Sequence, residues 1–273
     1  MGRIRLLYLL FVLFFLFSGT YSFGDQSTFR IDWRVREIVV TGIGYIIPRD
    51  TGNTMEWQHS ATVNAKQHLL KSFIASMKDL RIDAYNYARD IMIKEPQRNE
   101  AVFGYMGNIG EFDVKYGEET VSLEKHIPFF GAGGVVNLLI ESGNDPGNFP
   151  SYNEFVYSTG FTGLVIDGRG LRKIPAINPR IFDEEHNLVY SVDLLDVESF
   201  IQWGACQYTD DPHYRGFEER VGNNPLQIVA IHNEKLIETD LSISNENAKV
   251  LLQHEETRKS LQEGRVIVIL DDI

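Results

Sequence analysis

The amino-acid sequence predicts an α+β protein: a small N-terminal domain of strand, helix, strands and hairpin, then a second, mixed α/β domain. Three observations favour this class. A β-branched run precedes a long helical pattern, an alternating hairpin follows that helix, and short apolar strands then alternate with helix signals. We expect a first domain over residues 28–130, a linker over 131–158 and a C-terminal domain over 159–273.

The N-terminus predicts a secretory signal peptide over residues 1–24. Two arginines precede the apolar run Leu6–Phe17, which is shorter than the roughly 20 residues of a membrane-spanning helix, and small residues follow it. Cleavage after Ser22 or after Gly24 both fit, and the alternative is an uncleaved anchor. A lipid anchor is not expected, because it requires a cysteine at the cleavage point and the single cysteine is Cys206.

Composition limits the compartment and the partners. One cysteine allows no intramolecular disulfide, and the chain has no Asn-x-Ser/Thr site, which together favour a bacterial periplasm. Removing the signal takes away two arginines and no acid, so the formal charge goes from −12 to −14. Such an acidic chain predicts no nucleic-acid partner. No integral membrane span is expected after cleavage, and no cofactor motif is present.

The first half predicts strand, helix and hairpin in that order. Residues 31–47 are rich in β-branched side chains, which predicts one strand ending near Gly42 and Gly44. A long helix is predicted by apolar residues that recur at i+4: Trp57, Ala61, Ala65, Leu69, Phe73 and Met77.

Three further elements are expected before the boundary. Residues 84–93 predict a short helix that Pro96 ends, and Val102–Met106 predicts a strand. Alternation on both sides of Gly117 predicts a hairpin that stops at Pro128.

The second half predicts strands with short helices between them. Leu164–Ile166 predicts a strand, residues 179–182 and 188–192 a hairpin, and residues 197–204 a short helix. Residues 226–231 predict a buried strand, and Ser244 ahead of an apolar periodic run predicts a helix start. Residues 265–270 are apolar throughout, which predicts a strand central in its sheet.

Candidate metal ligands are few. His59 and His68 lie nine residues apart on the predicted helix and therefore face opposite sides. Cys206, Asp210, Asp211 and His213 lie close together in CQYTDDPH, where a metal would need a further ligand. The alternative is a polar loop with one free thiol, and we expect no metal.

The stretch FTGLVIDGRG (161–170) raises the question of phosphate or acid chemistry. It lacks the spacing of either common nucleotide loop, so Asp167 is the candidate residue. Asp167 and Asp183, with Glu184 beside it, could form the carboxylate pair of a hydrolase that acts on an envelope polymer. The alternative is a turn in which Asp167 accepts backbone N–H groups or pairs with an arginine. Asp167, Arg169 and Arg180 are accordingly expected as turn or interface residues.

Two segments resemble known families. REIVVTGIGYIIP, ATVNAKQHLLKSFIASM and FDVKYGEETVSLEKHIPFFG resemble the Lpp-twenty lipoprotein domain, which also begins the flagellar T-ring assembly protein, although this helix lacks the arginines typical of that family. The segment 157–190 is similar to exported two-domain bacterial envelope proteins. The resemblance implies an envelope location, at times linked to motility, and it supplies no catalytic residues.

The sequence therefore predicts a non-enzymatic exported protein of the periplasm or outer envelope, with a structural or protein-interaction role. An envelope or flagellum-associated protein is the expected partner, and a homo-oligomer is compatible with the pattern. The alternative is the hydrolase that uses Asp167 and Asp183.

Overall fold

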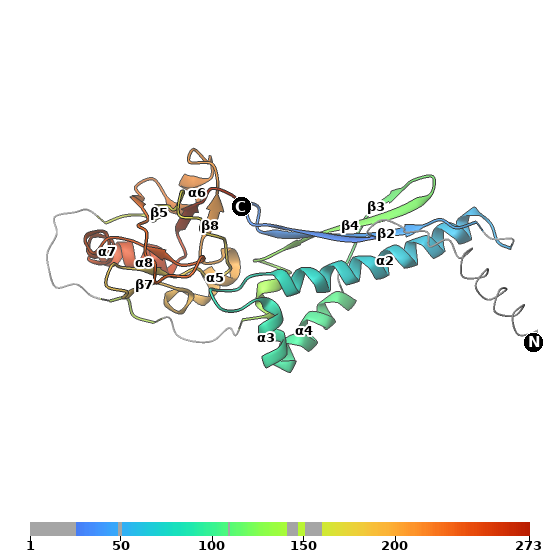
Figure 1. The fold of residues 1–273 in the computed structure, drawn as a ribbon, viewed down its shortest axis with the longest axis horizontal. Helices are drawn as coiled ribbons and strands as arrows, with labels where there is room; N and C mark the ends of the chain where they lie inside the picture. The colour runs from blue at the N-terminus through green and yellow to red at the C-terminus, as the bar shows by residue number, and fades with distance from the viewer. Residues whose placement is uncertain (1–25, 49–50, 109, 141–146, 151–159) are drawn as a thin grey trace, which may run out of the picture.

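The computed structural model describes residues 26–48, 51–108, 110–140, 147–150 and 160–273. The expected signal peptide and much of the expected linker lie outside these residues. The described chain forms an elongated molecule in which a sheet-and-helix arm projects from a second α/β domain (Figure 1). The predicted class, an α+β first domain followed by a mixed α/β domain, is confirmed.

The arm contains a four-stranded antiparallel sheet in the order β1-β2-β4-β3. Its strands are β1 (Ser27–Asp32), β2 (Glu37–Tyr45), β3 (Asp113–Tyr116) and β4 (Thr120–Pro128). The single strand predicted over 31–47 is wrong, because the chain reverses between β1 and β2. Asp32 Oδ1 accepts the backbone N–H groups of Arg34 and Val35, and Arg36 takes a left-handed conformation at φ 60°.

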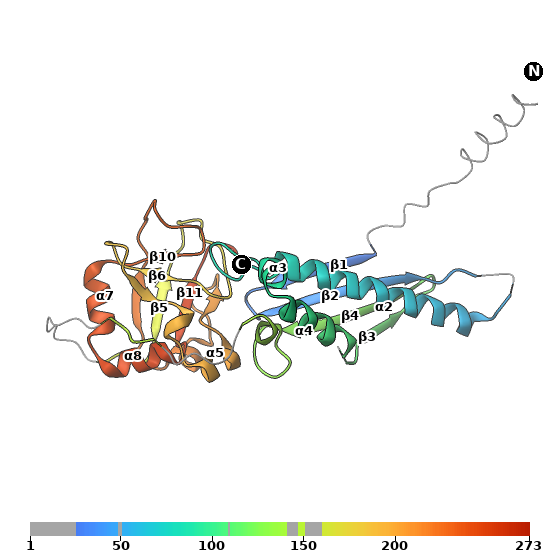
Figure 2. The same cartoon turned by 90° about the horizontal axis from the view of Figure 1, so that it is seen from below.

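Helix α2 (Thr54–Asp79) confirms the long predicted helix and covers one face of this sheet (Figure 2). Asn53 caps its N-terminus, because its side chain accepts the Glu56 N–H. Two glycines of β2 let the helix lie almost in contact with the strand. A Cβ atom at Gly42 would lie 2.1 Å from the Ala65 carbonyl oxygen, and one at Gly44 would lie 1.9 Å from that of Ala61.

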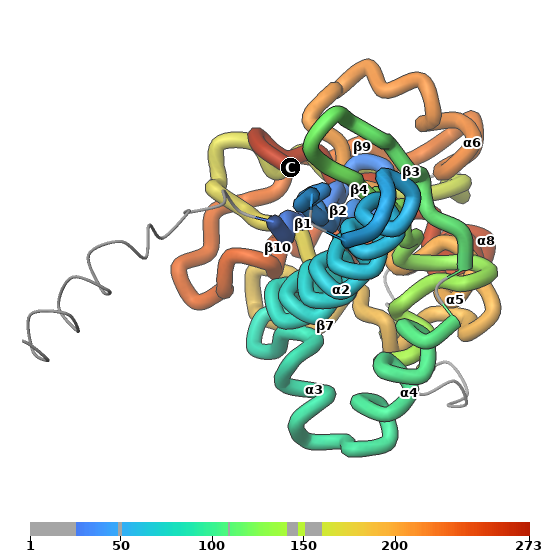
Figure 3. The backbone as a smooth tube through the Cα atoms, turned by 90° about the vertical axis from the view of Figure 1, so that its right-hand side faces the viewer, coloured from blue at the N-terminus to red at the C-terminus, as the bar shows by residue number. Residues whose placement is uncertain are grey.

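Helices α3 (Ala88–Lys94) and α4 (Pro96–Gly107) lie on the side of α2 away from the sheet (Figure 3). The strand predicted at Val102–Met106 is wrong, since these residues lie inside α4. Pro96 occupies the first turn of a helix, where its missing N–H costs nothing, so it starts α4 directly after α3 ends. The predicted β3–β4 hairpin is confirmed.

The C-terminal domain is built around a parallel sheet in the order β8-β11-β5-β9. Strand β11 (Val266–Ile269) lies between β5 (Leu164–Asp167) and β8 (Gln207–Thr209), and β9 (Leu226–Val229) pairs with β5. The predicted central position of the last strand is therefore confirmed. All four residues of β11 are buried.

A smaller sheet, β10-β6-β7, completes this domain. It contains β6 (Ile181–Phe182), β7 (Leu188–Tyr190) and β10 (Leu241–Ser242), and the β6–β7 hairpin confirms the predicted one. The helices of the domain are α5 (Val197–Trp203), α6 (Phe217–Val221), α7 (Asn245–Leu252) and α8 (Glu255–Gln262). Ser244 caps α7 as predicted, while α6, α8, β8 and β10 were not anticipated.

Candidate functional site at the domain junction

Backbone hydrogen bonds fix the arm to the C-terminal domain. The loop between α2 and α3 presents the carbonyls of Arg81 and Ile82, which accept the N–H groups of Ile177 and Asn178 at 3.1 and 2.7 Å. The N–H of Gly131, beyond β4, donates to the Ile201 carbonyl in α5 at 2.8 Å. The junction is therefore held at two separate points of the arm.

Aromatic side chains fill the space between these points. Trp33, in the turn between β1 and β2, meets Phe129 and Tyr208 edge to face, with ring centroids 5.1 and 6.1 Å apart. Phe130 meets Phe200 of α5 in the same geometry. Trp33 and Tyr208 belong to different domains, so these contacts bury apolar surface across the junction.

Two guanidinium groups, of the half-buried Arg36 and the buried Arg220, close the junction on the side of α5. Arg36 Nη1 donates to the Trp203 carbonyl at 2.5 Å, and Arg220 donates to the carbonyls of Trp203 and Gly204, both at 2.8 Å. These carbonyls end α5 and have no partner within the helix. Burial lowers the pKa of Arg220 to about 10 and also lowers that of Arg36. Both groups remain cationic at neutral pH and cap the helix.

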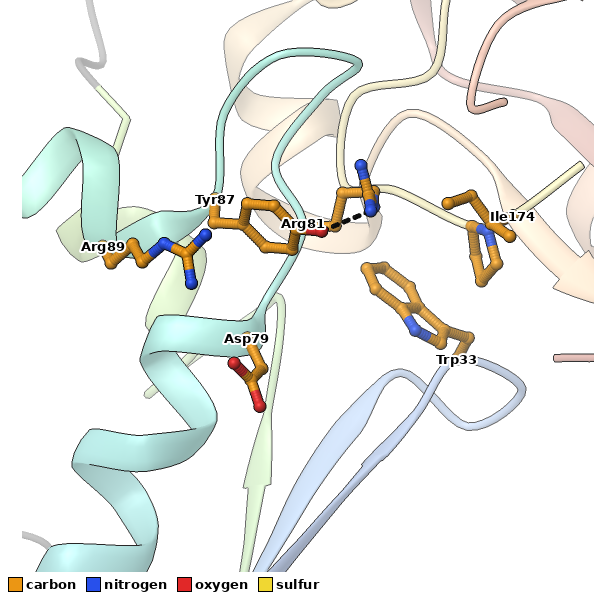
Figure 4. Close-up of a pocket in the computed structure, with 7 residues that line it drawn as sticks. Trp33, Asp79, Arg81, Tyr87, Arg89 and Ile174 are labelled. Carbon is orange, nitrogen blue, oxygen red and sulfur yellow. Dashed lines mark hydrogen bonds between the residues drawn. The ribbon is translucent and has the colours of Figure 1, made fainter. Parts of the chain in front are cut away.

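A cavity of about 360 Å³ opens at this junction (Figure 4). Both domains line it: the arm contributes Trp33, Asp79, Arg81, Tyr87 and Arg89, and the C-terminal domain contributes Ile174 and Pro175. This volume suits a small molecule or one side group of a larger partner.

The Tyr87 ring organises the cationic part of this junction pocket. The guanidinium carbons of Arg81 and Arg89 lie 4.5 and 4.6 Å from its centroid. Arg81 Nη2 also donates to the Tyr87 hydroxyl, and the two guanidinium groups appear on different sides of the ring in Figure 4. Cation–π contacts of this kind hold the arginines in place without neutralising their charge.

Local hydrogen bonds hold the loop that carries these residues. Asp83 Oδ1 accepts the backbone N–H groups of Tyr85 and Asn86 at 2.7 and 2.8 Å, which forms a tight turn. The Tyr87 N–H then donates to Asp90 Oδ2 at 2.8 Å and fixes the start of α3. The positions of Arg81 and Tyr87 therefore follow from the loop and its contact with the other domain.

The pocket is cationic in an acidic chain. Within the described residues Arg81 makes no ion pair, and Arg89 makes only a 3.9 Å contact to Asp90. Asp79 is the single carboxylate in the lining. Two guanidinium groups and one carboxylate leave a formal surplus of one positive charge, against −12 for the whole chain.

A second cavity, of about 390 Å³, lies between α5 and α8. Several of its lining groups already have partners. Asp196 caps α5 by accepting the Ser199 N–H, and Trp203 Nε1 donates to the Glu263 carbonyl. This cavity has two carboxylates and one lysine, so it lacks the cationic surplus of the junction pocket.

Asp167 ends β5 and forms a turn with Arg169. Its carboxylate accepts the Arg169 backbone N–H and two guanidinium N–H groups at 2.6–3.1 Å. The hydrogen bonds from the Arg169 side chain lower the pKa of Asp167. The Gly170 N–H donates to Asp271 at 2.8 Å, and its φ of 80° is one that glycine tolerates. These contacts are those of a charged turn.

Asp183 and Arg180 have different partners. Asp183 is buried after β6 in the smaller sheet, and both its oxygens accept N–H groups of Asn187 at 2.7 and 2.8 Å. Arg180 donates two hydrogen bonds to Asp240. Its guanidinium carbon lies 5.2 Å from the centroid of the Tyr85 ring, which belongs to the arm. Arg180 is thus a contact between the two domains of one chain.

The CQYTDDPH segment does not assemble a metal site in the described chain. Cys206 is buried, and burial raises the pKa of its thiol to about 11. Asp210 pairs with Arg34 at 2.5 Å, and Asp211 accepts the His213 N–H. Among the described residues no three His, Cys, Asp or Glu side chains gather closely enough to hold a metal ion.

The lining of the junction pocket was missed by sequence reasoning. Residues 81–89 (RIDAYNYAR) carry an unusual density of Arg and Tyr, and this was the one available signal. It could not show that Trp33 and Ile174 lie beside them, because that depends on how the two domains dock.

Comparison with known proteins finds a family model that matches part of the chain. The fold and the pocket define a two-domain α+β protein with a cationic cavity at its domain junction. Residues 163–272, the C-terminal domain from β5 to β11, match the family model of the second domain of Tp0624 from Treponema pallidum. The expected Lpp-twenty resemblance is wrong, since the family found is a different one and lies in the other half of the chain. The search of curated proteins found no match.

No helix in the described part of the chain has the length and apolar character needed to cross a membrane.

Proposed function

We propose that the protein is a non-enzymatic exported protein of the bacterial envelope that binds a protein partner at its domain junction. The observation that carries this proposal is the junction pocket itself: two domains build it, and its lining holds two arginines against one carboxylate. A group that binds there would touch both domains at once. The periplasmic or outer-envelope location rests on the N-terminal signal pattern.

The contacts of the candidate acids support a binding role over the hydrolase alternative. Asp167 and Asp183 are each engaged in their own turn, and neither lines the junction pocket. A hydrolytic pair needs two carboxyl groups that face one cleft at a set separation. No observation in the described residues favours that arrangement.

Site-directed photo-crosslinking in the native bacterium tests the proposal. A photoreactive amino acid at Ile174, in the pocket lining, is expected to capture a defined partner. The matched control places the same amino acid at Val229, which is 67% exposed and outside the lining. Adducts at both positions alike, or at neither, would contradict binding at the junction.

A further inference from the structure

The Arg81 side chain has N–H donors that no described residue accepts. A guanidinium group has five N–H donors, and within the described residues one of them is used, on the Tyr87 hydroxyl. Stacking against Tyr87 and the backbone bond from Ile177 to the Arg81 carbonyl hold the residue in place. The remaining donors are therefore fixed before a ligand arrives, which favours paired binding to a planar anion.

Tyr87 supplies a further donor. Its hydroxyl oxygen accepts a hydrogen bond from Arg81, and within the described residues its own O–H proton has no acceptor. A hydroxyl that accepts a bond from a cation is polarised and becomes a stronger donor. Arg81, Arg89 and Tyr87 thus offer an anion several donors on one side of the pocket.

The wall of the pocket next to Arg81 is apolar. Trp33 is held edge to face by Phe129 and Tyr208, and Ile174 is fixed by its N–H bond to the Glu238 carbonyl at 3.1 Å. In Figure 4 the Trp33 ring and Ile174 lie on the Arg81 side of the pocket. A ligand that placed an anion on Arg81 would rest its adjoining atoms on this wall.

The charge of the lining selects among anions. Asp79 offsets one of the two arginines, so the surplus is one positive charge, which suits a monoanion such as a carboxylate better than a phosphate dianion. Asp79 also repels any anion that binds beside it.

We propose that the junction pocket binds a carboxylate carried on an apolar or aromatic body, such as the C-terminal carboxylate of a peptide. This rests on the proposed binding of a protein partner at the junction and adds the chemistry of the group that enters. Arg81 and Arg89 bind the carboxylate, the Tyr87 hydroxyl donates to it, and Trp33, Ile174 and Pro175 contact the apolar part.

The test uses N-acetyl-phenylalanine as the probe and nuclear magnetic resonance of the full chain as the readout. Titration is expected to shift the Trp33 indole N–H signal with a Kd on the order of 1 mM. N-acetyl-phenylalaninamide, which lacks the carboxylate, should bind at least about tenfold more weakly, and binding should weaken as salt is added. Equal binding of the acid and the amide would overturn the assignment.

Four variants separate the role of the site from general effects. Arg81→Gln is expected to weaken binding at least about tenfold, and Arg89→Gln about threefold to tenfold. Asp79→Asn should tighten binding about twofold to fivefold, a gain that damage to the fold would not produce. Arg30 forms an ion pair with Asp32 outside the pocket, so Arg30→Gln should leave the affinity for the probe unchanged.

Each remaining outcome has a defined meaning. Weaker binding in Asp79→Asn would overturn the assignment in favour of a ligand that also carries a cation. Tighter, Arg81-dependent binding of inorganic phosphate than of the probe would overturn it in favour of a phosphate site. A crosslinked partner at Ile174 without probe binding would refute the carboxylate and leave the proposed function. Probe binding without a crosslinked partner would refute the proposed function and leave the carboxylate site.

Discussion

Arg220 and Arg36 show how the fold uses charge away from the surface. Both are buried or half-buried, and both donate to the carbonyls that end α5. A cation at the carboxyl end of a helix satisfies these carbonyls and neutralises their partial negative charge. Arg220 also stacks on Trp203 at 4.7 Å, so its aliphatic stem and its charge both contribute to packing.

Arg220→Met is expected to lower the free energy of unfolding by about 2–4 kcal/mol, because the Gly204 carbonyl loses its charged donor inside the protein. Urea denaturation measures the change. Arg265→Met is the control: Arg265 lies over the same Trp203 ring but is partly exposed, so a loss below about 1 kcal/mol is expected. Equal losses would contradict the capping role.

His126 makes a pH-dependent contact on the arm sheet. The hydrogen bond that His126 Nδ1 donates to Glu37 Oε1, at 2.8 Å, raises the pKa of His126, and Glu124 adds to the effect. A raised folded-state pKa stabilises the fold fully below the unfolded value of about 6.5, and this stabilisation is lost as pH rises through the folded pKa.

His126→Gln should therefore reduce the free energy of unfolding at pH 5.5 and leave it unchanged at pH 8.5. The loss should stay below about 1 kcal/mol, because the His126 side chain is 47% exposed and solvent screens the pair. Denaturation at the two pH values measures it. Lys115→Gln, which removes the contact of Lys115 with the same Glu124, is the control and should show no such pH difference.

At the scale of elements, the contact of α2 with β2 decides the shape of the arm. Gly42 and Gly44 leave no side chain between strand and helix, and Ala61 and Ala65 of α2 lie over them. The sequence showed small residues on both elements. Only the structure showed that these residues lie against one another and allow the close contact of strand and helix.

Gly42→Ala is expected to destabilise the protein by about 3 kcal/mol, because the new methyl group would overlap the Ala65 backbone and force α2 away from the sheet. Gly104→Ala is the matched control on the exposed face of α4, where no atom lies within 4 Å of the added Cβ. It should stabilise by about 0.5–1 kcal/mol through helix propensity. Denaturation of both variants gives the comparison, and a small effect of Gly42→Ala would argue against the close contact.

Two predicted elements were wrong for reasons visible at this scale. The strand predicted at Val102–Met106 is helical, because Pro96 does follow the end of the predicted short helix, α3, but also begins a new helix, α4, and the sequence pattern alone cannot separate these roles. The strand predicted over 31–47 reverses at a turn that an aspartate and a left-handed arginine form without glycine or proline. Local composition therefore hid both boundaries.

At the scale of the whole molecule, the junction joins the two domains into one body. Trp33 contacts Phe129 of the arm and Tyr208 of the parallel sheet, so it packs against both domains. The junction also carries the bonds to Arg81 and Ile82 that position the pocket. Substitutions at the junction are therefore expected to affect both its stability and the shape of the pocket.

The full chain is expected to unfold in a single cooperative transition. Trp33→Ala should lower stability by about 3–5 kcal/mol and split that transition, since it removes the packing shared by the two domains. Hydrogen exchange measured by mass spectrometry would report on each domain separately. Trp57→Ala, in the first turn of α2 at the end of the arm away from β8 (Figure 1), should destabilise without separating the domains. A single transition in Trp33→Ala would contradict the coupling.

The mistaken family resemblance also belongs to this scale. Order and periodicity of a strand, a long helix and a hairpin recur in unrelated α+β proteins, since they satisfy the same packing rule. The family match lies in the C-terminal domain, whose short strands carried a weaker pattern.

The sequence by itself determined the class of the fold, the long helix, both hairpins, the cap at Ser244 and the central last strand. These depend on periodicity, turn chemistry and capping, which act over a few residues. It also indicated that Asp167 and Arg169 belong to a charged turn. Only the tertiary structure decided the pocket, because Trp33, Arg81 and Ile174 are distant in the chain and become neighbours through the packing of two domains.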